Sequence, residues 1–138
     1  MTSPVEALRT AVRSQLLADA NVMQIVTGVY ETAPSDAIYP YITFGNDRLR
    51  DWSAKTFLGQ EHDVILNCWS TSHNFAELYA AHDRIKPLLR ASNLTLQDHH
   101  LAVLTIQEER FILDRDRNRR LGVLRCRALT HADDITPA

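Results

Sequence analysis

The sequence predicts an α+β fold in which one mostly antiparallel sheet of four to five strands has the helices packed on one face. Two observations lead to this prediction. Apolar residues recur every three or four positions in two segments, as in amphipathic helices, and four other segments have the composition and alternation of strands. The order helix, short helix, strand, strand, helix, strand, strand suits a layer of helices on an antiparallel sheet.

Length and composition indicate a single domain, residues 1–138, with a frayed tail at 133–138. A chain of 138 residues can bury roughly two-thirds of the surface that it exposes when unfolded. The net charge of −2 gives no basic footprint for nucleic acid. Cys68 and Cys126 lie in strand-like segments and are expected to be reduced core thiols. No signal peptide and no membrane-spanning segment are expected.

The N-terminal segment has the pattern of a capped helix. Ser3 is the predicted N-cap, Pro4 follows where its missing N–H costs nothing, and Glu6 stands at the capping-box position. Apolar residues then recur at helical spacing. Residues 19–26 are predicted as a second short helix that ends at a left-handed Gly28, and residues 29–32 as a brief strand.

The central segment contains two strand-like runs, residues 41–45 and 62–69, which we expect to pair antiparallel. The polar connection between them, residues 46–59, is much longer than a tight hairpin turn, and we call it the arm. The main helix is predicted from about Phe75 to Leu89. Pro87 near its end predicts a kink or an early stop.

Residues 99–113 and 122–130 alternate as strands and are joined by a polar turn at 114–118, which predicts a hairpin. In 122–130, Leu124, Cys126 and Ala128 form an apolar row on one face. The opposite face of the sheet is expected to be polar and to include Asn67, Glu108, Arg110, Arg125 and Arg127. Long strands with such a face can pair or stack with another copy.

A calcium loop is suggested by the spacing of Asp114, Asp116 and Asn118. However, Arg119 stands where the sharp turn of that loop needs glycine, and Arg125 stands where its bidentate glutamate belongs. We therefore expect no calcium site.

Other candidate chemical groups are better explained as structural residues. His99 and His100 are adjacent, so on a strand they point to opposite faces, and we expect both to be surface residues. His82 lies on the apolar stripe of the main helix and is expected to be a partly buried or interface residue rather than a base. Cys68 has no base nearby in the sequence. The sequence therefore predicts neither an enzyme nor a cofactor or metal site.

The arm contains large apolar residues, Trp52, Phe57 and Leu58, among charged ones. Two interpretations are open: the apolar residues fold back over the core of their own domain, or the arm docks on a neighbouring subunit, where an aromatic anchor surrounded by arginines is favourable. The densest basic cluster is at the predicted hairpin turn, where acidic residues interleave with it. A solvated tip is favoured there over a reader of nucleic acid.

Several short stretches, spread from about Glu6 to His131, carry a resemblance. They are a Pro-Tyr-Ile-Thr-Phe-Gly run at 40–45, Arg-Asp-Trp at 50–52, His-Asp-Val-Ile-Leu at 62–66, Trp-Ser at 69–70 and Glu-Arg at 109–110. In this dispersed pattern the chain resembles the tail-completion family of tailed phages and phage-derived gene transfer particles. The family has no catalytic residues to carry over.

The resemblance implies a tail terminator, a virion protein made in the bacterial cytoplasm that closes into a hexameric ring at the head-proximal end of the tail tube. Such a ring stops tube polymerisation and joins the tail to the head. The implied partners are other copies of the chain, the major tail tube protein and the head-side connector or stopper protein. DNA passes through the ring without sequence-specific binding, and no membrane is involved.

A ring needs two different patches on each subunit. We predict that Arg48, Arg50, Trp52 and Phe57 form one interface. A second group, Arg117, Arg119 and Arg120, is predicted to lie on a tip that meets another ring or faces the channel.

Three alternatives remain. The chain is another head-tail connector or minor tail protein, a small-ligand-binding α+β protein with a cleft near Cys68 or His82, or an accessory factor that binds nucleic acid.

Overall fold

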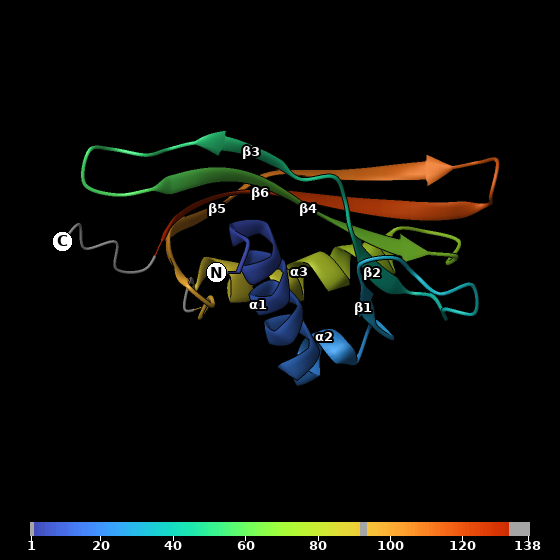
Figure 1. Ribbon diagram of the computed structural model, residues 1–138. Coiled ribbons are helices and arrows are strands. Elements are labelled where there is room, and N and C mark those ends of the chain that lie inside the picture. Colours follow the sequence, from blue (N-terminus) through green and yellow to red (C-terminus); the bar gives the residue numbers. More distant parts are fainter. Residues whose placement is uncertain (1, 92–93, 133–138) are drawn as a thin grey trace.

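The computed structural model describes residues 2–91 and 94–132 and confirms the α+β fold (Figure 1). In chain order the elements are α1 (Pro4–Ala18), α2 (Ala20–Met23), β1 (Val29–Tyr30), β2 (Tyr41–Phe44), β3 (Arg48–Asp51), β4 (Gly59–Ser70), α3 (Ala76–Arg90), β5 (His99–Asp114) and β6 (Arg119–Ala132). The sheet has six strands rather than four to five, because the arm contains a strand of its own. The predicted tail at 133–138 lies outside the described residues.

Helix α1 has the predicted apolar spacing but not the predicted cap. Ser3 takes the N-cap position and Pro4 the first turn, yet the Ser3 side chain makes no capping hydrogen bond, so the capping-box prediction is wrong. The preceding residue, Thr2, is instead bonded to Asp98 and to His99, the first residue of β5. The Thr2 N–H donates to the Asp98 carboxylate at 2.7 Å, and the Thr2 carbonyl accepts from the His99 ring at 2.8 Å. Contacts with a distant strand therefore fix the start of the helix.

Helix α2 is shorter than predicted, although Asp19 caps it by accepting a hydrogen bond from the Val22 N–H at 2.9 Å. The expectation of a left-handed Gly28 is wrong, since none of the glycines in the described chain has a positive φ. Gly28 is instead a place of close approach: a Cβ there would lie 2.6 Å from the Tyr30 ring. The strand that follows, β1, has two residues and pairs parallel to β2.

The sheet has the strand order β1-β2-β4-β6-β5, with β3 also pairing to β4. The predicted antiparallel pairing of β2 and β4 is confirmed. Both β2 and β3 lie along the edge of β4 that β6 does not occupy, with Phe44 opposite Leu66 and Arg48 opposite Asp63. Between these two pairs there is a step of four residues along the chain from Phe44 to Arg48, but of only three along β4 from Leu66 to Asp63. The extra residue is a bulge that joins two pieces of one edge.

Helix α3 continues through Pro87 to Arg90, so the prediction of an early stop near this proline is wrong. The lost hydrogen bond is that of the Asp83 carbonyl, four residues earlier. Asp83 and Pro87 are both exposed, so water can satisfy that carbonyl.

The predicted C-terminal hairpin is confirmed and is longer than expected. Strands β5 and β6 pair from His99 opposite Ala132 to Asp114 opposite Arg119, with register shifts near Val103 and Glu108. In the turn, Asn118 has a φ of 50°, a left-handed value that asparagine tolerates better than most residues.

The core lies between the helices and the inner face of the sheet (Figure 1). The predicted apolar row of β6, which includes Leu124 and Cys126, is buried there. Cys68 and Cys126 are free thiols, and burial raises the pKa of each to about 12. The prediction of core thiols is confirmed for both.

On the other face of the sheet the structure shows no covering helix within the described chain (Figure 1). We call this the outer face. The sheet is longer than the helix layer, so the turn between β3 and β4 projects at one end and the turn between β5 and β6 at the other. In the described part of the chain, no helix is long and apolar enough to cross a membrane.

Candidate assembly surfaces

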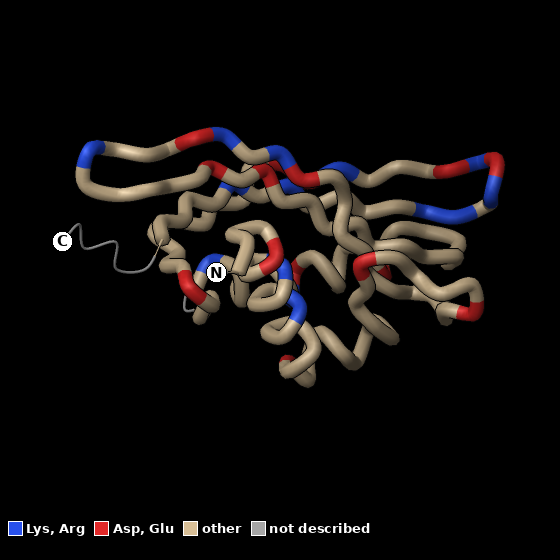
Figure 2. Tube along the Cα trace, in the orientation of Figure 1, with Lys and Arg blue, Asp and Glu red and all other residues tan. Residues whose placement is uncertain are grey.

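The middle of the outer face carries a ladder of ion pairs across four strands. Arg50 of β3 donates to Glu61 of β4 at 2.7 Å, and Arg127 of β6 donates to the same carboxylate at 2.6 Å. Farther along, Arg125 lies 3.6 Å from Glu108 of β5. Figure 2 shows charges of both signs along these strands. The predicted polar face is therefore present, and its charges are mutually compensated.

Glu61 is the centre of the ladder. Its hydrogen bonds from Arg127 and from Arg50 hold the pKa of the Glu61 carboxyl below its ordinary value. Exposed ion pairs contribute little individually, but several charges sharing partners hold side chains in defined positions. The ladder thus presents a fixed pattern of charge to any protein that meets this face.

Aromatic rings pack together at the arm end of the outer face. Trp52 and Phe57 pack edge to face with ring centroids 5.3 Å apart, and Phe57 lies 6.1 Å from the His131 ring. Gly59 makes this packing possible, because a Cβ there would lie 2.7 Å from the Trp52 carbonyl and 2.9 Å from the Phe57 ring. Trp52 and Phe57 stay partly exposed and neither joins the main core. The arm therefore extends the edge of the sheet, with these two rings apart from the main core of the domain.

The structure corrects the description of the arm as a polar connection. Residues 48–51 form β3, and all four are exposed. Leu58, at the start of the return to β4, exposes 59% of its surface. Arg48, Arg50, Trp52 and Phe57 come from this one hairpin and lie on the outer face. Their role as an interface stays a prediction.

The other end of the outer face carries the predicted arginine group, but the structure divides it. Arg117 is exposed in the turn. Arg119 is the first residue of β6, with its guanidinium 4.0 Å from the centre of the Trp69 ring and its Nε 3.2 Å from Asp114. Arg120 points to the helix side and donates to the Ser72 carbonyl at 2.7 Å. Two of the three arginines thus hold the end of the sheet together.

The histidines lie in structural positions. His82 is buried and is paired with Glu109 at 2.9 Å. Burial alone would raise the pKa of Glu109, but the hydrogen bonds from Lys86 and His82 outweigh it and hold that pKa below its ordinary value. His99 is also buried, which corrects its prediction as a surface residue, whereas His100 is exposed as predicted. The reason is that His99 faces the N-terminus of α1 and bonds it.

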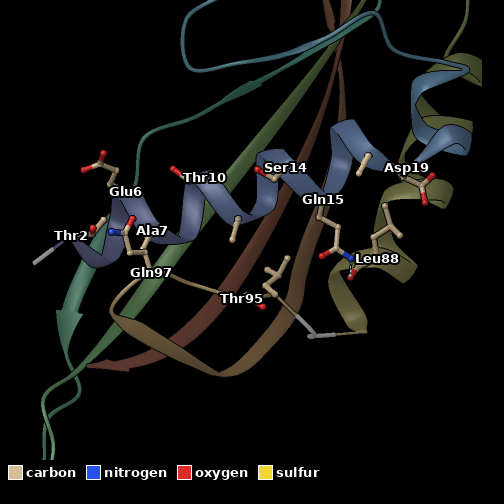
Figure 3. A pocket seen from close by; sticks show the side chains of 13 residues that line it. Thr2, Glu6, Ala7, Thr10, Ser14, Gln15, Asp19, Leu88, Thr95 and Gln97 are labelled. Atoms are coloured by element: carbon tan, nitrogen blue, oxygen red, sulfur yellow. Dashed lines mark hydrogen bonds between the residues drawn. The ribbon is translucent and has the colours of Figure 1, made fainter. Parts of the chain in front are cut away.

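A groove of about 760 Å³ runs between α1 and the segment after α3 (Figure 3). It is open and lined mostly by short side chains, and it lies away from Cys68 and His82, where the ligand-binding alternative expected a cleft. Over the described residues, no group of three His, Cys, Asp or Glu side chains is arranged to hold a metal ion. The ion-pair ladder and the Trp52–Phe57 pair lie on the outer face, away from this groove.

Comparison with protein families gives a match to the tail completion protein gp17 family over residues 10–131. The chain belongs to this family. The match covers β1 to β6 and most of α1, so it includes both ends of the outer face. It assigns the chain a tail-completion role in a phage-like virion. Membership in this structural family also favours a protein without enzymatic activity.

Two solved structures are similar to this tail completion protein. A chain in the virion of a native gene transfer agent (GTA) particle is 27% identical, with a TM-score of 0.87 over 96% of this chain and 100% of that one. The bacteriophage SPP1 gp17 protein is 19% identical, with a TM-score of 0.57 over 96% and 93% of the two chains, and shows the same fold. No curated protein sequence gives a significant match.

Sequence reasoning missed β3 and the ladder that it begins. A signal was present: Arg48 and Arg50 alternate, as do Glu61 and Asp63 after the arm. Antiparallel strands that place opposite charges across from each other are favoured. Matching these two alternations would have predicted the pairing of Arg48 with Asp63 and Arg50 with Glu61 that the structure contains.

Proposed function

We propose that this tail completion protein is a tail terminator, which forms a hexameric ring at the head-proximal end of the tail tube. The ring stops tube polymerisation and joins the tail to the head-side connector or stopper protein. Its partners are other copies of the chain, the major tail tube protein and that connector. DNA passes through the ring without sequence-specific contacts.

The observation that carries this proposal is the family match over residues 10–131, together with the similarity to a chain of a native virion. The shape of the subunit supports it. A closed ring needs a heterologous contact, in which one patch meets a different patch of the next subunit. The arm at one edge and the polar outer face of the sheet can supply two such patches. The arginine-bearing hairpin projects at the other end of the sheet, where it can meet another ring or face the channel (Figure 2).

Deletion of the gene tests the proposal. We expect particles without this protein to have tails of abnormal length, or tails and heads that fail to join, when they are examined by electron microscopy. Restoring the intact chain should restore normal particles. Normal particles in the deletion strain would refute a terminator role.

A substitution tests the arm as an interface. Trp52→Ala is expected to reduce ring formation and head-tail joining while the subunit remains folded, because the Trp52 ring is outside the main core. Ring formation can be followed by light scattering and joining by particle counts. Arg117→Ala, at the other end of the sheet, is a matched comparison that separates the two predicted patches. Unchanged rings and joining in Trp52→Ala particles would show that the arm is not an interface.

A further inference from the structure

At the arm end of the sheet, both edges are open. In the described chain, no strand pairs with the outward side of β3 or with the outward side of β5. Open edges are costly to leave exposed, because their unpaired N–H and C=O groups invite pairing with another chain. β5, with 16 residues, is the longest strand of the sheet. An edge of this length needs either protection or a partner.

The two edges lie on opposite sides of the sheet and run in opposite directions. Across the arm end of the sheet the order is β3, β4, β6, β5, and each neighbouring pair is antiparallel. β3 therefore runs antiparallel to β5. If a second copy stands beside the first in the same orientation, β3 of one copy meets β5 of the next as an antiparallel pair.

The row that crosses the four strands at this end has an exposed apolar side chain at or beside each of its ends. It runs from Arg50 through Glu61 and Leu129 to Val103. Val103 exposes 38% of its surface, and Leu49, next to Arg50 and on the other face, exposes 39%. These are large apolar side chains on edge strands, where pairing with another strand would cover them.

Charge also matches across the two edges. Arg48 of β3 makes no ion pair with any of the residues described. On the same face of β5, Glu108 exposes 46% of its side chain while it lies 3.6 Å from Arg125 and 3.8 Å from Arg110. Exposed pairs of this kind contribute little individually, so a further arginine can share the carboxylate. A basic outer-face residue on one edge and an acidic one on the other suit a contact between unlike patches, which closes into a ring when the rotation between copies permits.

We propose that β3 of one copy pairs antiparallel with β5 of the next, so that the sheet continues from subunit to subunit around the ring. This inference rests on the proposed ring and specifies its contact. The partner at each edge is a second copy of this chain. The inference also assigns a role to the arm. The arm pairs its strand β3 with β4 and leaves the outward N–H and C=O groups of β3 free to bond a second copy.

Hydrogen exchange resolved to single amides tests this contact without assuming a register. The Trp52 N–H donates to the Gly59 carbonyl at 2.9 Å, and alternate residues of an antiparallel strand face the same neighbour. The N–H groups of Arg50 and Trp52 thus face β4, and those of Leu49 and Asp51 face outward. On assembly, exchange at Leu49 and Asp51 should slow by about tenfold or more, while Arg50 and Trp52, already bonded, serve as internal controls.

The possible results distinguish a failure of the proposed strand pairing from a failure of the proposed ring. The purified chain is measured at low concentration and after assembly, alone or on purified tail tubes, with rings verified by electron microscopy. Rings with slowed exchange at Leu49 and Asp51 support the inference. Rings with unchanged exchange there overturn the strand pairing and leave the ring standing. Failure to form rings under either condition overturns both.

A substitution provides a second test. Leu49→Pro removes an N–H that faces outward, and proline is tolerated on an edge strand when its missing N–H faces solvent. Leu49→Thr removes the same apolar side chain but keeps the N–H. The inference predicts rings for Leu49→Thr and folded monomers for Leu49→Pro, by light scattering and circular dichroism. Intact rings of Leu49→Pro would contradict it, and should that variant unfold, the exchange measurement decides.

Discussion

On the inner face of β4 and β6, alternate side chains are apolar and lie beneath the helices, whereas on the outer face the side chains between them include four charged residues of the ion-pair ladder. The same two strands thus serve a core on one side and an open surface on the other. Substitutions on the inner face should therefore lower the free energy of unfolding, whereas substitutions on the outer face should mainly weaken assembly. Adjacent residues on one strand can be compared directly.

The largest expected effect is at Leu124, which is fully buried on the inner face. Leu124→Ala should lower the free energy of unfolding by about 2–5 kcal/mol, because it removes buried methyl groups and leaves a cavity. Val123→Ala, next to it on the outer face, is the control and should cost about 1 kcal/mol or less. Denaturant unfolding measures both. Equal costs would show that the two faces are not energetically distinct.

A smaller effect is expected at Gly122, where the inner face meets α3. A Cβ there would lie 2.6 Å from Nε2 of His82. Gly122→Ala should therefore cost about 1–3 kcal/mol through overpacking. In a His82→Ala background the ring is absent, so the added cost of Gly122→Ala should shrink. If the cost is the same in both backgrounds, the clash with His82 is not its cause.

The smallest effect is expected at Glu61 on the outer face, and it should depend on pH. Since bonds from Arg127 and Arg50 hold the pKa of Glu61 below its ordinary value, the folded state binds fewer protons at this site than the unfolded state. The stabilisation is present above the unfolded pKa and is lost as the pH falls through the lowered folded pKa. The stability difference between the native chain and Glu61→Gln should thus shrink on acidification. A difference that is independent of pH would contradict the ladder.

Much of the fold could be predicted because local patterns specify it. The alternation in 122–130 predicted which side chains of β6 are buried, and the proline-bearing start of α1 was visible in the sequence. Local signals misled where a distant contact decided the outcome. Ser3 does not cap its helix because Asp98 and His99 hold Thr2, and His99 is buried for the same reason.

The candidate site was predicted only in part. The sequence singled out Trp52 and Phe57 as unusual, but not the strand beside them, since Arg-Leu-Arg-Asp at 48–51 has no apolar face to bury. Those residues become a strand because β4 extends past β2 and leaves an edge to pair with. The arginines at 119 and 120 looked alike in sequence, yet one stacks on Trp69 and the other bonds the Ser72 carbonyl on the opposite face.

The amino-acid sequence by itself determined the α+β class, the helix layer, the long C-terminal hairpin and a charged face, because periodicity in hydrophobic and polar residues is a local property of the chain. The tertiary structure alone decided that the arm pairs along β4, that its aromatic rings close one end of the outer face, and that two edges of the sheet remain open. These features depend on which strands lie side by side. Backbone pairing between distant segments produces only a weak pattern in the sequence of either segment.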